Sequence, residues 1–274
     1  MMMRRIFIAS LPLRVVASAS KSPPRRALST GLEGYNAAQV SMMEEMCILV
    51  DADDNVLGGD TKKNVHLMDG PCMVAGGPPH RAFSVFLFNQ KNELLMQKRS
   101  VEKILFPLHW ANTCCSHPLH DGATFLGTEI TGEMDGGAGC VRAARRKLEQ
   151  ELGIAPEQLP TDCFQVVTRV HYKAPMPGPS PRWGEHEVDY LLVARPEHDV
   201  TVAPNPEEVA EARWMSQQQI RQLVADAAAG ADELISPWFG EIEGLLLHTW
   251  WEDLARIESD SAIHRCYMSD THAR

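Results

Sequence analysis

The sequence lacks the excess of basic residues that a general nucleic-acid or anionic-membrane binder presents on one face. It has 26 lysines and arginines against 36 aspartates and glutamates, and its net charge is -10. It also lacks any apolar stretch of the ~20 residues that a membrane-spanning helix needs. We therefore expect no nucleic-acid partner and no membrane span. A small anionic ligand needs only a few local lysines and arginines.

Paired cysteines at metal-binding or redox spacing are also missing. The chain has 7 cysteines, an odd number, and none of them forms a CxxC pair. A secreted disulfide framework and a structural zinc site are both disfavoured, and an intracellular protein with reduced thiols fits better. The adjacent pair Cys114–Cys115 would bond to itself only with strained geometry.

Acidic residues are absent from the beginning of the chain. The stretch "MMMRRIFIASLPLRVVASASKSPPRRALST" carries six basic residues, and no acid precedes Glu33. This composition predicts a disordered organelle-targeting presequence over residues 1–32, with an untargeted basic tail as the alternative. The context Arg26-Ala-Leu-Ser resembles a matrix-protease cleavage site and favours the mitochondrion over the plastid, which stays the alternative.

The rest of the chain has the composition of a protein with a buried core, since 44% of residues are hydrophobic and 23% are charged. We expect a domain over residues 40–260 and a C-terminal tail over 261–274. Period-two patterns predict strands and 3.6-period patterns predict helices. The predicted strands are 46–51, a hairpin over 81–100 with its turn at 89–92, 164–174, 186–196 and 208–216, and the predicted helices are 139–153, 217–227 and 239–257. This mixed order indicates an α/β (α+β) sandwich, in which a mixed β-sheet is flanked by helices.

The stretch "RKLEQELGI", residues 146–154, resembles the end of the Nudix signature, whose glutamates hold catalytic metals. Lys147 and Gln150 stand where two of those glutamates belong, and only Glu151 remains. The alternative is an ordinary amphipathic helix that ends at Gly153.

Two carboxylates alternate in the stretch "WGEHEVDY", residues 183–190. On a strand, Glu185 and Glu187 point to the same face because side chains alternate with period two. Such a pair repels itself unless it is solvated, protonated or bound to a cation. A solvated sheet edge is the common explanation, but the apolar residues from Val188 onward indicate that the strand becomes buried.

Three histidines could complete a metal site with these carboxylates, namely His66, His80 and His117. In the stretch "NTCCSHP", an extended backbone places Cys115 and His117 on one face and Cys114 on the other, and Pro118 favours that extended conformation. A single histidine of this kind is more often structural. Three imidazoles and two carboxylates together form a donor set suited to Mn²⁺, Zn²⁺ or Mg²⁺.

The chain as a whole resembles the type I isopentenyl-diphosphate delta-isomerases of the Nudix superfamily. The matching motifs are "NTCCSHPL", "RAFSVFLFN", "WGEHEVDY", "RKLEQELG" and "SPW", in the family's order over roughly residues 44 to 255. The resemblance implies a Nudix-type fold and an enzyme of isoprenoid biosynthesis that acts on a small isoprenoid diphosphate. It would interconvert isopentenyl and dimethylallyl diphosphate by metal-assisted protonation and deprotonation. A Nudix hydrolase of a diphosphate and a non-enzymatic metal-stabilised binding protein are the competing interpretations.

The resemblance also implies roles for individual residues. Cys115 and Glu187 would be the acid–base pair, with Tyr172 as a further catalytic aromatic residue. A divalent metal would be held by His66, His80, His117, Glu185 and Glu187. Glu151 would hold Mg²⁺ that meets the substrate diphosphate. Substrate contacts would come from Lys62, Arg99, Lys103, Ser116, Lys147 and Trp238.

A glycine-rich insert over residues 121–139, "DGATFLGTEITGEMDGGAG", departs from the family's pattern. Its glycines and exposed acids predict a surface loop, and a cover over the site is the alternative. The expected reaction passes through a carbocation or something close to it, so its site must exclude water. The π face of Trp238 could stabilise such a cation by roughly 0.5–2 kcal/mol.

Overall fold

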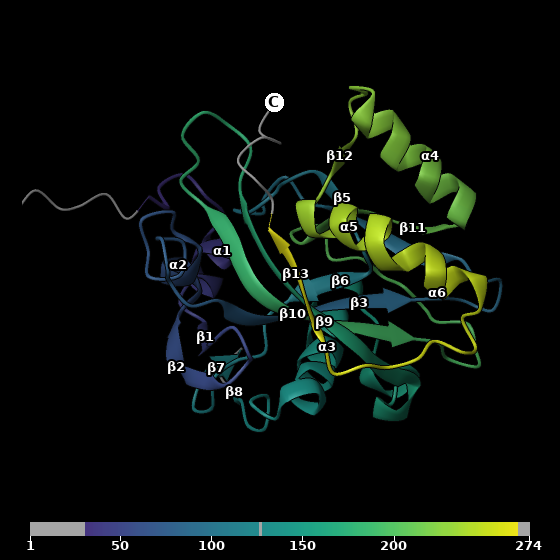
Figure 1. Cartoon of the computed structure of the whole chain (residues 1–274), viewed down its shortest axis with the longest axis horizontal. Coiled ribbons are helices and arrows are strands. Elements are labelled where there is room, and N and C mark those ends of the chain that lie inside the picture. Colours follow the sequence, from purple (N-terminus) through teal and green to yellow (C-terminus); the bar gives the residue numbers. More distant parts are fainter. Residues whose placement is uncertain (1–30, 126–127, 268–274) are drawn as a thin grey trace, which may run out of the picture. The chain divides into compact units, whose positions relative to one another are not determined.

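The computed structural model describes residues 31–125 and 128–267 (Figure 1). The chain divides into two compact units, residues 1–33 and 34–274. In the first unit the backbone N–H of Gly31 donates to the Glu33 carboxylate, at 2.9 Å. The predicted presequence, 1–32, lies almost wholly outside the described residues.

A seven-stranded sheet carries the site. In spatial order its strands run β13-β9-β10-β3-β1-β2, and β6 also pairs with β3. β3 and β10 are parallel, whereas β9 and β10 are antiparallel. The bounds are β1 (Met46–Val50), β2 (Val56–Thr61), β3 (His80–Leu87), β6 (Cys114–Ser116), β9 (Phe164–Pro175), β10 (Gly184–Ala194) and β13 (Ile263–Tyr267).

A second sheet of four strands has the order β11-β4-β5-β12. Its strands are β4 (Leu94–Arg99), β5 (His109–Ala111), β11 (Val209–Met215) and β12 (Leu234–Ile235), and a separate pair is formed by β7 (Thr124–Phe125) and β8 (Thr128–Glu129). The predicted hairpin over 81–100 is therefore wrong, because β3 and β4 belong to different sheets and meet only at the bridge Phe88–Leu94. The reason is that β10 and β6 already occupy the two sides of β3, so the chain leaves through the predicted turn and starts a new sheet.

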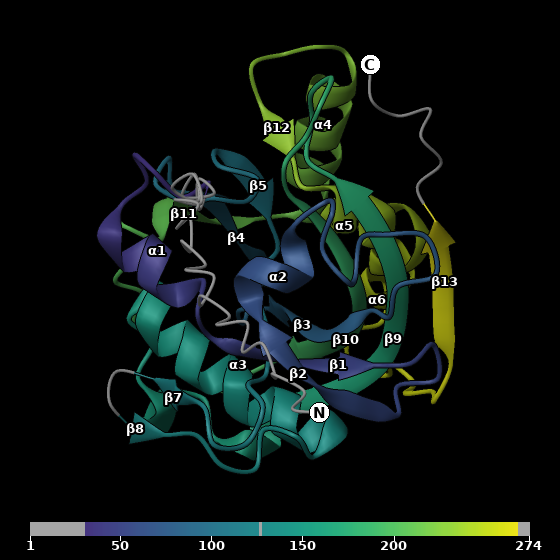
Figure 2. The ribbon, with the colours of Figure 1, turned by 90° about the vertical axis from the view of Figure 1, so that its left-hand side faces the viewer.

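Helices cover both faces of the large sheet (Figure 2). On one face α3 packs against Phe83, Val85 and Leu87, the odd-numbered residues of β3. On the other face Phe86 contacts Phe239 of α5 and Trp250 of α6. The helices are α1 (Ala37–Met42), α2 (Lys62–His66), α3 (Gly136–Leu152), α4 (Gln217–Ala228), α5 (Pro237–Ile242), a π-helical turn (Glu243–Leu247) and α6 (His248–Glu252), with 3-10 turns at Pro156–Gln158 and Thr161–Cys163. The predicted fold class is confirmed.

Helix α3 follows the predicted pattern. Val141, Ala144, Leu148 and Leu152 are all buried in the main core. Gly153 ends the helix at φ 61°, and its backbone N–H bonds back to the last turn. A left-handed residue at this position favours glycine because glycine has no Cβ to clash. Residue 151 is thereby fixed on the helix face that meets β6.

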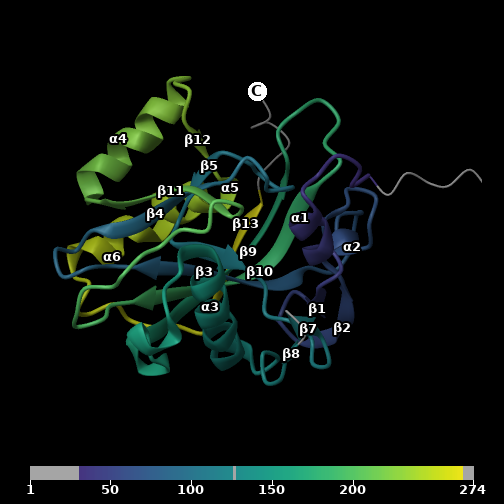
Figure 3. The same ribbon diagram turned by 180° about the vertical axis from the view of Figure 1, so that it is seen from behind.

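The folded unit extends beyond the expected limits of 40 and 260 at both ends. Helix α1 begins at Ala37, where the Asn36 side chain caps it. Strand β13, within the segment predicted to be a tail, pairs with β9 at the edge of the sheet. The sequence there has no long apolar run that would have predicted a strand. The last predicted helix, 239–257, starts instead at Pro237 and ends at Glu252. Figure 3 shows α1 and α2 beside each other near β1. No helix among the described residues is long and apolar enough to span a bilayer.

Candidate active site

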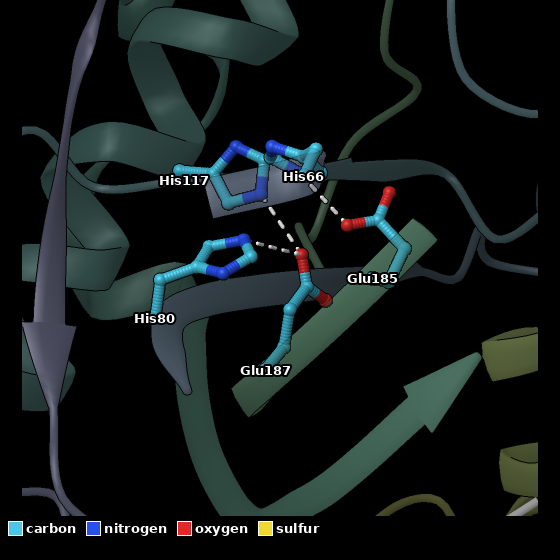
Figure 4. A group of neighbouring side chains, drawn as sticks. All are labelled: His66, His80, His117, Glu185 and Glu187. Atoms are coloured by element: carbon cyan, nitrogen blue, oxygen red, sulfur yellow. Dashed lines mark hydrogen bonds and ion pairs between the residues drawn. The ribbon is translucent and has the colours of Figure 1, made fainter. Parts of the chain in front are cut away.

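Five buried side chains converge from four parts of the fold (Figure 4). His66 ends α2, His80 begins β3, and His117 follows β6. Glu185 and Glu187 lie on β10, where Glu187 is the direct register partner of His80. One ligand atom from each of the five lies within 4.8 Å of all the others. The structure thus brings together all five residues that the sequence proposed as ligands of one metal.

The atoms of this cluster that could bind a metal carry lone pairs that point toward one another. His66 donates its Nδ1–H to the Lys62 carbonyl at 2.6 Å, which leaves a lone pair on Nε2. That Nε2 lies 2.8 Å from Glu185 Oε2, although neither atom makes a hydrogen bond within the described residues. Two acceptor atoms that face each other in this way are matched by a cation placed between them. Ligands at ~2.0–2.2 Å on opposite sides of one cation lie roughly 4.0–4.4 Å apart, and the five atoms here lie within 4.8 Å of one another.

Charge in the cluster also suits a cation. Burial lowers the pKa of His80 to about 4 and that of His117 well below its usual value, so both imidazoles are neutral at pH 7. Burial opposes ionisation of Glu187, but hydrogen bonds from His117 and His80 outweigh it and hold the pKa of that carboxyl well below its usual range. Burial raises the pKa of Glu185. Three imidazoles with two carboxylates form a mixed nitrogen and oxygen donor set that suits a divalent cation.

A pocket with about 610 Å³ of empty volume opens beside this cluster. At one part of its wall Cys115 and Trp238 meet, with Trp238 Nε1 3.0 Å from Cys115 Sγ. The hydroxyl of Tyr172 donates a hydrogen bond to Glu187. Other predicted residues that line the pocket are Lys62, Arg99, Lys103, Ser116 and Glu151. Polar, cationic and aromatic groups therefore surround a single space.

The two adjacent cysteines face opposite ways, as the extended backbone predicted. Cys115 lines the pocket, and Cys114 is fully buried in the core against α3. Burial raises the pKa of the Cys115 thiol, and the neighbouring Asp189 raises it further. The thiol therefore keeps its proton at neutral pH.

One predicted substrate contact is placed elsewhere. Lys147 is 1% exposed and is not among the residues that line the pocket. Its ammonium lies 3.3 Å from Glu151 Oε1 and donates to Gln150 at 2.8 Å. Lys147 thus contacts Glu151 from the core side of α3 and does not line the pocket itself.

Glu151 is fully paired in this structure. Lys103 and Lys147 both lie against Oε1, and Gln97 donates to Oε2 at 3.2 Å. Burial opposes ionisation of Glu151, but the two lysines lower the pKa of that carboxyl. These partners occupy both carboxylate oxygens of Glu151, so in this arrangement they do not suit a resident metal ion, unlike the ligand atoms of the His/Glu cluster.

The glycine-rich insert forms the small β7–β8 hairpin and then turns inward. Glu133, which is 3% exposed, accepts a hydrogen bond from the Leu119 backbone at 2.7 Å and from Arg146 at 2.8 Å. Arg146 also donates to the His117 carbonyl at 3.4 Å. Residues 121–135 of the insert thus contain a surface loop in which Glu133 holds the chain segment after His117, whereas residues 136–139, which were predicted to belong to the loop, form the first turn of α3. Arg146 belongs to the Nudix-like motif, and it was the only hint in the sequence of this contact with Glu133.

Sequence reasoning also missed residues behind Cys115. Asp189 continues the period-two series of Glu185 and Glu187 on β10, so its position could have been read from the same pattern. Its Oδ2 accepts a hydrogen bond from Ser84 at 2.8 Å, and burial raises the pKa of this carboxyl well above its usual value. Asn112, which accepts a hydrogen bond from the Cys115 thiol, is the other missed residue.

Comparison with known proteins gives concordant results. The NUDIX domain model matches residues 78–239. An isopentenyl-diphosphate delta-isomerase of Gibberella zeae is 44% identical over 247 residues, which cover 90% of this chain and 88% of the relative. The isopentenyl-diphosphate Delta-isomerase I of Camptotheca acuminata is 46% identical, covering 81% and 90%. The isopentenyl-diphosphate Delta-isomerase II, chloroplastic, of Arabidopsis thaliana is 45% identical, covering 87% and 79%.

Proposed function

Because this chain belongs to the isopentenyl-diphosphate delta-isomerases of the NUDIX family, we propose which of its residues carry out the interconversion of isopentenyl and dimethylallyl diphosphate. The reaction adds a proton at one end of a three-carbon unit and removes another two carbons away. A single pocket must therefore present a proton donor, a base, an anchor for the diphosphate and a water-poor apolar space.

Cys115 and Glu187 are the proton-transfer groups. Both line the pocket, and their resting protonation states are opposite, since burial keeps the thiol neutral and hydrogen bonds keep the carboxylate ionised. In the forward direction Cys115 gives its proton to the terminal carbon, and Glu187 takes the proton released two carbons away. After the product leaves, Glu187 loses its proton and Cys115 regains one by exchange with solvent, which restores both groups. The reverse reaction exchanges their roles. The Trp238 N–H and Arg99 favour the thiolate that remains after the first transfer.

Tyr172 assists Glu187. Its hydroxyl donates to Glu187, and burial together with the charge of Glu187 raises the pKa of the phenol well above its usual value. The phenol therefore stays a hydrogen-bond donor throughout. It fixes the orientation of the carboxylate that receives the substrate proton.

The five-ligand cluster is proposed to bind a divalent cation, with Mn²⁺ or Zn²⁺ favoured by its donors and Mg²⁺ as the alternative. When bound, this cation supplies positive charge that keeps Glu187 ionised and orients it. His66 presents its Nε2 to the ion because its Nδ1–H is committed to the Lys62 carbonyl.

The substrate diphosphate is proposed to lie against Lys62, Arg99, Lys103 and Ser116, all of which line the pocket. Glu151 becomes a ligand only for Mg²⁺ that arrives with the diphosphate, because the diphosphate can take over the ammonium of Lys103. Lys147 then compensates the charge of Glu151 from the core. The hydrolase alternative is not favoured, since Lys147 and Gln150 bond to each other where hydrolytic glutamates would stand.

The observation that carries this proposal is the shared pocket of Cys115, Glu187 and the basic side chains. Purified protein with isopentenyl diphosphate, a divalent cation and a thiol reductant should form dimethylallyl diphosphate, followed by proton NMR. Glu187→Gln should abolish turnover while the protein stays folded. Release of inorganic phosphate without isomerisation would contradict the proposal.

An organellar location is proposed for the protein. The presequence composition of residues 1–32 supports it, as do the names of relatives that are called chloroplastic. Those names favour the plastid and give no support to the mitochondrion, which the Arg26 context had favoured. Residues 1–32 fused to a fluorescent protein should direct it into an organelle, and a cytosolic signal would contradict the proposal.

A further inference from the structure

Asn112 makes a closed triangle of contacts with two residues of the pocket. The Cys115 thiol donates to Asn112 Oδ1 at 2.9 Å. The indole Nε1–H of Trp238 points at both of them, 3.1 Å from Asn112 Oδ1 and 3.0 Å from Cys115 Sγ. Asn112 is itself completely buried. It does not line the pocket, so it acts on the site only through these two neighbours.

The orientation of the Asn112 amide is fixed by its other partners. Its Nδ2 donates to the backbone carbonyls of Val85 at 3.0 Å and Cys114 at 3.2 Å. These carbonyls belong to register partners on β3 and β6, so the amide is anchored where the two strands pair. A flipped amide would put its NH₂ against the indole N–H and turn its oxygen toward two carbonyls, which cannot donate to it. Oδ1 must therefore face the thiol and the indole.

An amide oxygen can only accept hydrogen bonds, and this decides where the thiol proton lies. The S–H bond of Cys115 points at Asn112 Oδ1, while one sulfur lone pair receives the Trp238 N–H. Rotation of the S–H bond about Cβ–Sγ, away from Asn112 and toward the substrate, then presents the proton for transfer while the Trp238 N–H keeps the sulfur in place. A sulfur without these two contacts would be free to change its rotamer.

We propose that Asn112 is a positioning residue for the isomerisation: its anchored amide holds Cys115 Sγ and the Trp238 indole in one arrangement, and its oxygen accepts the S–H bond until the substrate binds. The inference rests on the proposed role of Cys115. It adds that the asparagine three residues earlier sets the geometry of proton transfer without touching the substrate.

The proposal predicts a loss in kcat and little change in KM. Misplacing a reacting group by about 1 Å can lower the rate about 10²-fold. Asn112→Leu has a similar size and no acceptor, so its kcat should fall about 10- to 100-fold. Its KM should stay within about threefold, because the diphosphate contacts are untouched. Asn112→Asp keeps an acceptor at the Oδ1 position. Buried against the Val85 and Cys114 carbonyls, its second oxygen must be protonated and donate to one of them, so kcat should stay within about tenfold of the wild type.

A spectroscopic measurement separates positioning from a merely structural role. The infrared S–H stretching band of Cys115, identified by its loss in Cys115→Ala, should lie at the low frequency of a hydrogen-bonded thiol. It should move to higher frequency in Asn112→Leu and stay low in Asn112→Asp. Thr113→Val is the matched control, since Thr113 is equally buried but its hydroxyl bonds only to the backbone of Leu87 and Leu95. It should cost stability and leave both the band and kcat unchanged.

The two failures are distinguishable. Full turnover by Cys115→Ala would overturn the role of Cys115, whereas the infrared test of the Asn112 contact would still stand. A folded Asn112→Leu with wild-type kcat and an unmoved S–H band would overturn the role of Asn112. If Asn112→Leu does not fold, Asn112→Ala takes its place. If neither folds, a free-thiol frequency in Asn112→Asp would overturn the proposal.

Discussion

His80 and Glu187 face each other across the parallel strands β3 and β10 as direct register partners, with His80 Nε2 3.4 Å from Glu187 Oε1. Glu187 belongs both to the proposed metal cluster and to the proposed pair of proton-transfer groups. The two strands are distant in sequence, so one register sets both functions. A shift of one residue would turn Glu187 away from the pocket.

The metal site can be tested by removing single ligands. His66→Ala and Glu185→Ala should each lower bound metal and activity together, because each removes one donor of the same cluster. Metal content by atomic spectroscopy gives the measurement. His186→Ala is the control, since His186 lies between the two glutamates on the opposite face and bonds to the Cys72 carbonyl. Unchanged metal in both ligand variants would show that the ion binds elsewhere.

The buried pair Glu133–Arg146 should hold the backbone around His117, a proposed metal ligand, in place. Glu133→Ala leaves Arg146 partly buried without its carboxylate and should destabilise the protein by about 3–5 kcal/mol. It should also weaken metal binding about 10- to 100-fold, as loss of an outer-shell partner does. Urea unfolding and metal titration measure the two effects. The exposed pair Asp135–Arg142 is the control, and Asp135→Asn should change stability by less than about 1 kcal/mol. Equal effects of the two variants would contradict the prediction.

Truncation should separate the presequence from helix α1. The sequence pattern placed the start of the domain at residue 40. In the structure Gln39 and Met43 line the pocket. Removal of residues 1–30 should leave kcat intact, whereas removal of 1–43 should raise KM or abolish activity, as steady-state assays would show. Full activity of the longer truncation would contradict the role of α1 in the pocket wall.

Acid should destabilise the protein partly through His186. Burial lowers its pKa to about 4, while a histidine in the unfolded chain titrates near ~6.5. Between these values the unfolded state binds the extra proton, so stability falls as pH drops from about 6.5 to 4 and this contribution then levels off. Urea midpoints across that range measure the slope, and His186→Gln should reduce it. An identical slope in the variant would assign the effect to other groups.

Local patterns predicted much of the fold and of the site. The alternation of Glu185 and Glu187, the opposite facing of Cys114 and Cys115, and the core face of α3 all follow from strand and helix periods. The sheet to which a strand belongs depends on long-range partners, so β4 was assigned to the wrong neighbour. β13 gave no signal because its pairing with β9 depends on the partner strand more than on its own composition.

The outer parts of the site were less predictable for the same reason. Glu133 holds the Leu119 backbone, and the backbone carbonyls of Val85 and Cys114 anchor Asn112. Folding brings these groups near, and no spacing in the sequence indicates the contacts. Lys147 aligned with a ligand-binding position, yet the helix turns it into the core beside Glu151. Alignment gives the position along the helix, whereas burial decides what a side chain can reach.

The central claim is that Cys115 transfers a proton to the substrate and Cys114 does not. The most direct measurement is turnover of isopentenyl diphosphate by Cys115→Ala and Cys114→Ala, followed by NMR, with circular dichroism to verify folding. Cys115→Ala should lose about 10²–10⁴-fold in kcat and remain folded. Cys114→Ala should retain most of its activity and lose stability through a small core cavity. A well-folded Cys114→Ala without turnover, beside an active Cys115→Ala, would contradict the account.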